Sequence, residues 1–353
     1  MRYIIHIWLI YTPAIGEIAS FIDRFPNLHV LEMRNFALRQ VPANLARLSE
    51  LRELTLSSCG ITFTPEGQTL LQSLSELERL NLSHNTLVQI PDLAGLPMLN
   101  DIRLINTGLA NVPNGLATHS NLRTALLNDN AITDLPESFF TMDIDLADGI
   151  NLAKNPLSTA TRDRIKAHYA AIGYDFGVLP EPADITKAQE LFPGLDIEDV
   201  THVIYELPGT LADGSAQLAH WEMEITQMVS DLAEWSDRAP AGPLGLNMIA
   251  ADRARQRFER RAFSRQLEHF WRSRQNSKTE LRLNAFDANL KVIGELPTLS
   301  ADFSHVSQLT LQGNEALSGT EGFLSCFSGL EALEMRGFAL GQVPLALSRM
   351  PKL

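Results

Sequence analysis

Residues 77–85 read Leu-Glu-Arg-Leu-Asn-Leu-Ser-His-Asn, and this nine-residue pattern decides the fold. Leucines at its first, fourth and sixth positions predict a short strand and turn that bury one side. The asparagine at its ninth position can hydrogen-bond to backbone groups that would otherwise be buried without partners. The pattern therefore predicts one coil of a stacked repeat.

The same pattern starts at residues 28, 51, 77, 99, 122 and 147, and the spacings between ninth positions are 23, 26, 22, 23 and 25 residues. Asn85, Asn130 and Asn155 keep the asparagine, whereas Cys59 and Thr107 replace it. Stacking such units buries a continuous apolar core that no single unit could bury alone. We therefore expect an α/β fold, a leucine-rich-repeat solenoid with short parallel strands.

The two ends of the chain resemble each other. Residues 25–51 and 327–353 are identical at 15 of 27 positions without a gap, and the same shift continues upstream. We therefore interpret residues 4–12 as a repeat strand rather than as a signal peptide, which His6 would interrupt. Neither end shows a polar cap, so we interpret the chain as a fragment, or a split reading frame, of a longer protein.

The period changes after Leu157, and an α-helical module is predicted to interrupt the solenoid. Ser158 and Thr159 are the candidate cap residues of a helix over 161–172, and Gly173 is expected to end it. Residues 218–235 carry a seam of apolar residues at heptad spacing, which predicts a helix over about 216–236. A second long helix is expected over 247–275. The predicted domains are a first array at 1–157, a helical cap and hairpin at 158–277, and the start of a second array at 278–353.

Charge is unevenly distributed. The net charge of −13 argues against a general nucleic-acid binder, and two cysteines exclude a disulfide scaffold. Residues 181–240 hold 13 acidic residues, whereas 251–278 hold nine basic ones. Two interpretations of the arginine-rich stretch stay open: it binds phosphate or an anionic membrane, or it neutralises the acidic helix beside it.

The concave face of the array is the default binding surface of a solenoid. A mixed and partly charged surface of this kind fits a protein partner, although an ordinary solvated face is the alternative. The candidate partner-binding residues are Glu32, Glu53, Thr55, Arg79, Asn81, Asp101, Arg103 and Leu126.

Motifs for catalysis are missing from the sequence: it has no HExxH pair, no GxSxG and no phosphate loop. We therefore expect no enzyme in this chain, no cofactor, no metal and no small-molecule substrate. Cys59 and Cys326 are interpreted as structural. A membrane-bound role is not expected, since neither a signal peptide nor a transmembrane helix is apparent.

Three features together resemble a bacterial family. They are the repeats ending at Asn155-Pro-Leu-Ser158, the segment Glu190-Leu-Phe-Pro-Gly-Leu195, and the helix from Leu218 to Trp235. This combination resembles the effector and toxin proteins of Gram-negative bacteria that carry a NEL-type (novel ubiquitin ligase) domain. The family's catalytic Cys-x-Asp is not matched, because Cys59 is followed by Gly-Ile and Cys326 by Phe-Ser.

The resemblance implies a protein-binding region of a secreted effector, found in the bacterial cytoplasm before export and in host cells after it. One alternative is the substrate-recognition part of a NEL-type ligase whose catalytic domain lies outside this chain. The other is a scaffold in which the helical insert, not the array, is the binding element.

Overall fold

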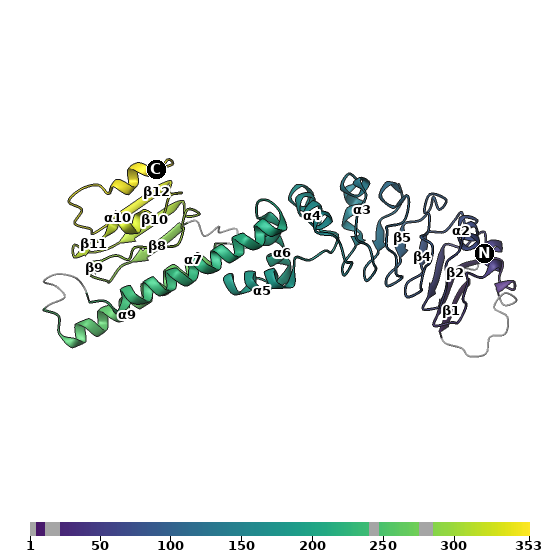
Figure 1. Ribbon diagram of the computed structural model, residues 1–353, viewed down its shortest axis with the longest axis horizontal. Helices are drawn as coiled ribbons and strands as arrows, with labels where there is room; N and C mark the ends of the chain where they lie inside the picture. Colours follow the sequence, from purple (N-terminus) through teal and green to yellow (C-terminus); the bar gives the residue numbers. More distant parts are fainter. Residues whose placement is uncertain (1–4, 11–21, 240–246, 275–284) are drawn as a thin grey trace. The chain divides into compact units, whose positions relative to one another are not determined.

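The computed structural model describes residues 5–10, 22–239, 247–274 and 285–353. The chain divides into two compact units, Met1–Leu179 and Pro180–Leu353. Each unit contains a parallel sheet built from repeats (Figure 1). The predicted α/β leucine-rich-repeat fold interrupted by helices is confirmed.

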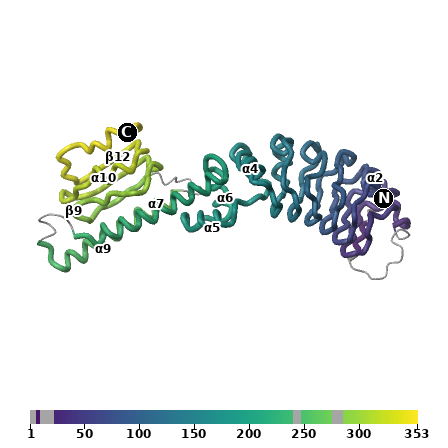
Figure 2. Tube along the Cα trace, viewed as in Figure 1, coloured from purple at the N-terminus to yellow at the C-terminus, as the bar shows by residue number. Residues whose placement is uncertain are grey.

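The first unit is a single parallel sheet whose strands follow one another in chain order. Its strands are β1 (Ile5–Ile10), β2 (Leu28–Arg34), β3 (Glu53–Ser57), β4 (Arg79–Asn81), β5 (Asp101–Arg103), β6 (Thr124–Leu126) and β7 (Ile150–Asn151). Short helical segments return the chain between strands: η1 (Ala43–Arg47), α2 (Pro65–Gln72), η2 (Leu116–Thr118), η3 (Glu137–Phe140) and α3 (Ile144–Asp148). Figure 2 shows these coils stacked one after another. The strand predicted from residues 4–12 is confirmed over 5–10, since β1 pairs with β2; its other residues lie outside the described part.

Leucines of the repeat fill the interior of this unit. Leu77, Leu80 and Leu82 are at most 1% exposed, and the matching residues of the neighbouring coils are buried with them. Each such leucine contributes about 1.5–3 kcal/mol through burial. A coil alone could not shield both of its flat sides, so the coils are stable only as a stack.

Asparagine side chains join the coils inside this stack. Oδ1 of Asn85 accepts from the backbone N–H groups of Cys59 and Ile61, both at 3.0 Å. Its Nδ2 donates to the carbonyls of Leu56 and Leu82, both at 2.7 Å. Asn130 and Asn155 repeat the arrangement in later coils. The predicted role of the ninth position is therefore confirmed.

Helix α4 (Thr159–Ile172) closes the first unit. The Ser158 hydroxyl accepts from the backbone N–H of Thr161, and Gly173 adopts a left-handed conformation at φ 79°. Both predicted ends of this helix are confirmed. Ile165 is fully buried, so α4 covers the last coil with an apolar side chain.

The second unit begins with helices. They are α5 (Pro182–Leu191), α6 (Ile197–Glu206), α7 (Leu211–Asp237) and α9 (Ala250–Arg272). The predicted seam is confirmed in α7, where Leu218, Ile225, Met228, Leu232 and Trp235 are buried. Helix α7 begins earlier than expected because Thr210 forms a capping box with Asp213.

A short second array follows these helices. Strands β8 (Ala285–Asn289), β10 (Gln308–Gln312) and β12 (Ala332–Arg336) form one parallel sheet, and β9 (Gly294–Glu295) pairs with β11 (Leu317–Ser318) in another. Helical segments α10 (Thr320–Leu324) and η4 (Leu345–Arg349) complete the coils. The expected start of this array near residue 278 lies outside the described residues.

Helices α7 and α9 pack as an antiparallel hairpin on the first coil of this array. Trp235 donates to the carbonyl of Glu295 at 2.8 Å, and Arg260 donates to the carbonyl of Ile293 at 3.0 Å. Gln256 exchanges hydrogen bonds with Lys291 and Ile293. These contacts satisfy backbone groups that a preceding coil would otherwise satisfy, so the hairpin caps the second array.

Candidate functional site

The outward-facing residues of the first sheet form two parallel columns, which we call the sheet face. Pairing across strands aligns Glu53, Arg79 and Asp101 in one column and Glu32, Thr55, Asn81, Arg103 and Leu126 in the other. All eight candidate residues named from the sequence therefore lie together on strands β2 to β6. They gather on one face because strand side chains alternate, and the repeat leucines occupy the opposite face.

Charges of opposite sign alternate along this face. Arg79 forms an ion pair with Glu53, and Arg103 forms a two-pronged pair with Asp101 at 3.0 and 2.8 Å. The hydrogen bond that Arg79 donates to Glu53, together with the nearby acidic groups, raises the pKa of Arg79. Asp101 raises the pKa of Arg103 in the same way. Both arginine side chains stay almost half exposed, so their charges are available to a partner.

Apolar and amide groups flank the charges. Trp8 of β1 lies beside Glu32 in the second column and is 69% exposed. Leu126, at the other end of that column, is half-buried. Oδ1 of Asn81 accepts from the backbone N–H of Ser83 at 3.0 Å, which holds its amide in place. The face thus offers charge, amide and aromatic groups within one surface.

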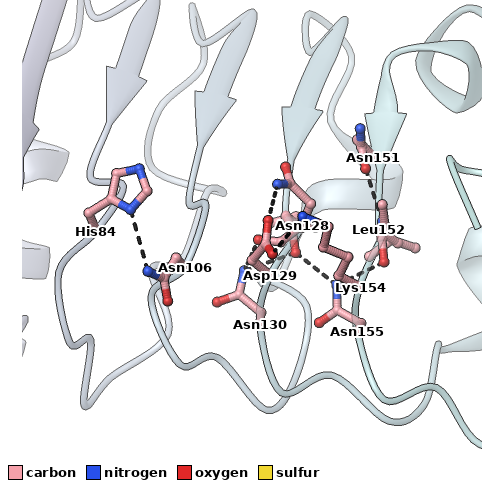
Figure 3. A network of polar contacts seen from close by, with 11 residues as sticks. His84, Asn106, Asn128, Asp129, Asn130, Asn151, Leu152, Lys154 and Asn155 are labelled. Atoms are coloured by element: carbon pink, nitrogen blue, oxygen red, sulfur yellow. Dashed lines mark hydrogen bonds and ion pairs between the residues drawn. The ribbon is translucent and has the colours of Figure 1, made fainter.

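A polar ridge that the sequence analysis missed follows the carboxyl ends of the strands. Its members precede the ninth repeat position and share a left-handed backbone conformation: Asn35, Ser58, His84, Asn106, Asp129 and Lys154. Asn106 contacts His84 at 3.4 Å, and Lys154 pairs with Asp129 at 3.5 Å (Figure 3). The signal was present, because position eight of the repeat is polar in these units.

The arginine-rich helix α9 is engaged within the second unit. Arg260 is 2% exposed and donates to the carbonyls of Trp235 and Ile293. Arg274 lies between the rings of Trp221 and Trp271, 4.5 and 3.9 Å from their centres. Both residues are therefore part of the packing and cannot form an anion-binding surface.

Exposed arginines of the same helix pair with the acidic helix. Arg257 and Arg261 contact Asp237 of α7 at 3.4 and 2.9 Å. These pairs match the interpretation in which the basic stretch neutralises the acidic one. As exposed ion pairs they contribute little to stability, at most about 1 kcal/mol each.

Neither thiol has the surroundings of a nucleophile. Cys59 is fully buried, and burial raises the pKa of its thiol. Burial also raises the pKa of Cys326 to about 12. Reactive cysteines need a lowered pKa and access to solvent, so both residues fit the structural role expected for them.

Other sites are chemically plain. A groove of about 630 Å³ lies between η2 and η3, and its lining mixes apolar residues such as Val112 and Phe139 with polar ones such as Asn114. No cluster of three metal-ligating side chains occurs among the described residues. Within the same residues, no helix combines the length and the apolar character needed to cross a membrane.

Comparisons with known proteins give limited matches. No family model matches the chain. A curated relative, the Ras guanine nucleotide exchange factor V of Dictyostelium discoideum, is 31% identical over 110 residues. That match covers 28% of this chain and only 6% of the length of the relative.

Two solved structures are similar in part. A leucine-rich-repeat protein of Leptospira interrogans shares 14% identity at a TM-score of 0.36, covering 95% of this chain and 73% of its own. An internalin of Listeria monocytogenes shares 12% identity at a TM-score of 0.33, covering 94% and 67%. The repeat spacing, the parallel register and the asparagine bonds of the chain itself identify its fold as that of the leucine-rich-repeat proteins.

Proposed function

We propose that the sheet face of the first array binds a protein partner. The observation that carries this proposal is the series of opposite charges Glu53, Arg79, Asp101 and Arg103. Its arginines are almost half exposed, and Trp8 lies on the same face. Arginine and tryptophan are the residue types that dominate binding energy at protein interfaces. Alternating charges favour a partner with the complementary order of charges and disfavour others.

The ion pairs within the face shape how it binds. Each arginine is already held by a carboxylate, so a partner meets a side chain whose position is largely set. Pre-organisation of this kind lowers the entropy lost on binding. A partner carboxylate can bind the exposed N–H groups of Arg103 while Asp101 keeps the guanidinium in place.

Placement of a photo-crosslinking amino acid tests the location of the binding surface. We expect the photo-crosslinking residue to capture a partner protein when it replaces Asn81. It should not do so when it replaces Val88, which is exposed beyond the strand. Crosslinking from both positions equally, or from Val88 alone, would contradict a binding surface on the sheet face.

The helical hairpin supports a second candidate. Met223 and Phe258 are 65% and 64% exposed on α7 and α9, so both large apolar side chains are accessible to a partner. If the hairpin is the binding element, a crosslinker at Met223 should capture the partner and one at Asn81 should not. The same experiment therefore separates the two candidates.

The effector role is a narrower form of the first proposal. It is supported by the resemblance of Glu190–Leu195 and of the helix from Leu218 to Trp235 to NEL-type effectors. In the ligase version, the partner of the sheet face would be the substrate to be ubiquitinated. Ubiquitination of a captured partner by this chain alone would contradict that version, since both thiols are buried or strongly shifted.

A further inference from the structure

Asn114 and Gly115 form the one Asn-Gly pair of the sequence. They lie just before η2, where Gly115 adopts a left-handed conformation at φ 80° and ψ −6°. Asn114 is exposed, and its side-chain amide has no hydrogen-bond partner among the described residues. Both residues line the groove of about 630 Å³ between η2 and η3, so water reaches them.

Asparagine is a thermolabile residue because its side-chain amide can react with the backbone that follows it. In this pair, the backbone nitrogen of Gly115 is the nucleophile, and Cγ of Asn114 is the carbon atom that it attacks. Glycine favours the attack because it has no Cβ to crowd the nitrogen and its backbone rotates freely. The glycine N–H must also be free, since a hydrogen bond to a carbonyl holds both the nitrogen and the proton that it has to lose.

Three glycines of the chain follow an asparagine or an aspartate, and their hydrogen bonds differ. The N–H of Gly149 donates to a backbone carbonyl at 3.1 Å, and that of Gly214 donates to another at 3.0 Å. The N–H of Gly115 has no such acceptor within the described part of the chain. Of the three sites, Asn114 therefore combines an accessible side chain with a free nucleophile.

We propose that Asn114 is a site of spontaneous modification by water, which converts its side-chain amide into a carboxylate. The Gly115 nitrogen bonds to Cγ of Asn114, the bond from Cγ to Nδ2 breaks, and ammonia leaves with the proton of the Gly115 N–H. Water then adds to one carbonyl of the five-membered imide and breaks its bond to the Gly115 nitrogen. Opening at Cγ gives aspartate, and opening at the main-chain carbonyl gives isoaspartate.

The modification changes a contact between two coils. Asn114 forms a parallel bridge with Asp92, and its carbonyl accepts from the Leu93 N–H at 3.1 Å. Isoaspartate adds one carbon to the backbone at this point, so it disturbs the register of the bridge. Either product also adds a negative charge to a groove that already contains Asp134. The site lies outside the sheet face, so the proposal is independent of partner binding there.

Peptide mapping by mass spectrometry of the folded 353-residue chain, incubated at neutral pH, tests this proposal. The conversion of amide to acid should accumulate at Asn114 at least about tenfold faster than at Asn111, because the branched side chain of Val112 crowds the nitrogen that would attack there. Asn111 is a matched control, since it is exposed and lines the same groove. In oxygen-labelled water, the product should carry one labelled oxygen atom and should separate into aspartate and isoaspartate forms.

Two comparisons show whether the fold decides which site reacts. Asn114→Gln should remove the conversion at this position, because a glutamine would have to close a larger ring. Isomerisation of Asp148 and Asp213 should stay slow in the folded chain and should speed up in urea, which breaks the hydrogen bonds of the glycines that follow them. An Asn114 that converts only after unfolding, an equal rate at Asn111, or a product without isoaspartate would each overturn the proposal.

Discussion

Replacing Asn85 with alanine removes a side chain that links two coils of the first unit. The side chain makes four hydrogen bonds of 2.7 to 3.0 Å to buried backbone groups of Cys59, Ile61, Leu56 and Leu82. Alanine would leave all four groups unpaired. At about 1 kcal/mol for each group, the lower end of the usual penalty, the free energy of unfolding should fall by about 4 kcal/mol.

Urea unfolding followed by circular dichroism measures this loss, and hydrogen exchange of the Cys59 and Ile61 amides localises it. The control is Asn111→Ala, because Asn111 is exposed in the same unit and should cost less than about 0.5 kcal/mol. Asn85→Thr should fall in between, since Thr107 occupies the equivalent position and donates to the Leu104 carbonyl. A loss below about 1 kcal/mol for Asn85→Ala would refute the role of these bonds.

Three further predictions concern stability. Burial lowers the pKa of His305 to about 4, so between pH 6.5 and 4 the unfolded chain binds a proton that the folded chain does not. The free energy of unfolding should therefore fall by up to about 3 kcal/mol as the pH drops from 6.5 to 4. Thermal melts at several pH values should show a weaker dependence for His305→Phe. Gly149→Ala should destabilise the first unit by several kcal/mol in urea melts, because its Cβ would lie 1.6 Å from the Arg123 carbonyl oxygen. Thr210→Ala should cost about 1 kcal/mol through the lost cap of α7, and an unchanged melt would contradict that role.

The repeats could be predicted because they are local. The nine-residue pattern of each unit marks its strand and its buried leucines. The asparagine at the ninth position marks the amide that bonds to the backbone of the neighbouring coil. The register of β1 on β2 could also be predicted, since residues 25–51 recur at 327–353 with the same spacing. The positions of the eight candidate residues on one face followed from the same pattern.

Docking of the hairpin on the second array could not be predicted. In the sequence, Arg260 is one of several arginines of a helix. In the structure it is buried and donates a hydrogen bond to the carbonyl of Ile293, 33 residues away. In the sequence, Trp235 is part of an apolar seam. In the structure its indole N–H also donates a hydrogen bond to the carbonyl of Glu295. Periodicity shows which face of a helix is apolar, but it does not show which distant backbone group that face will meet.

The sheet face also contained a feature that local pattern could not show. Charges on neighbouring strands are over 20 residues apart in the chain, and only the register brings Arg79 against Glu53. The sequence analysis therefore named the residues but not their pairing. That pairing leaves each arginine oriented and almost half exposed at once, which is the basis of the proposed binding surface.

A partner that crosslinking has identified can then be purified on its own. Its binding to sheet-face variants tests the central claim most directly. Titration calorimetry should show that Arg79→Glu and Arg103→Glu each weaken binding about 30-fold, as expected for loss of about 2 kcal/mol at an interface arginine. Arg47→Glu is the control, because Arg47 lies on η1, outside the sheet, and forms a comparable exposed ion pair with Asp23. Equal affinity of all three variants and the unmodified chain would contradict partner binding by the sheet face.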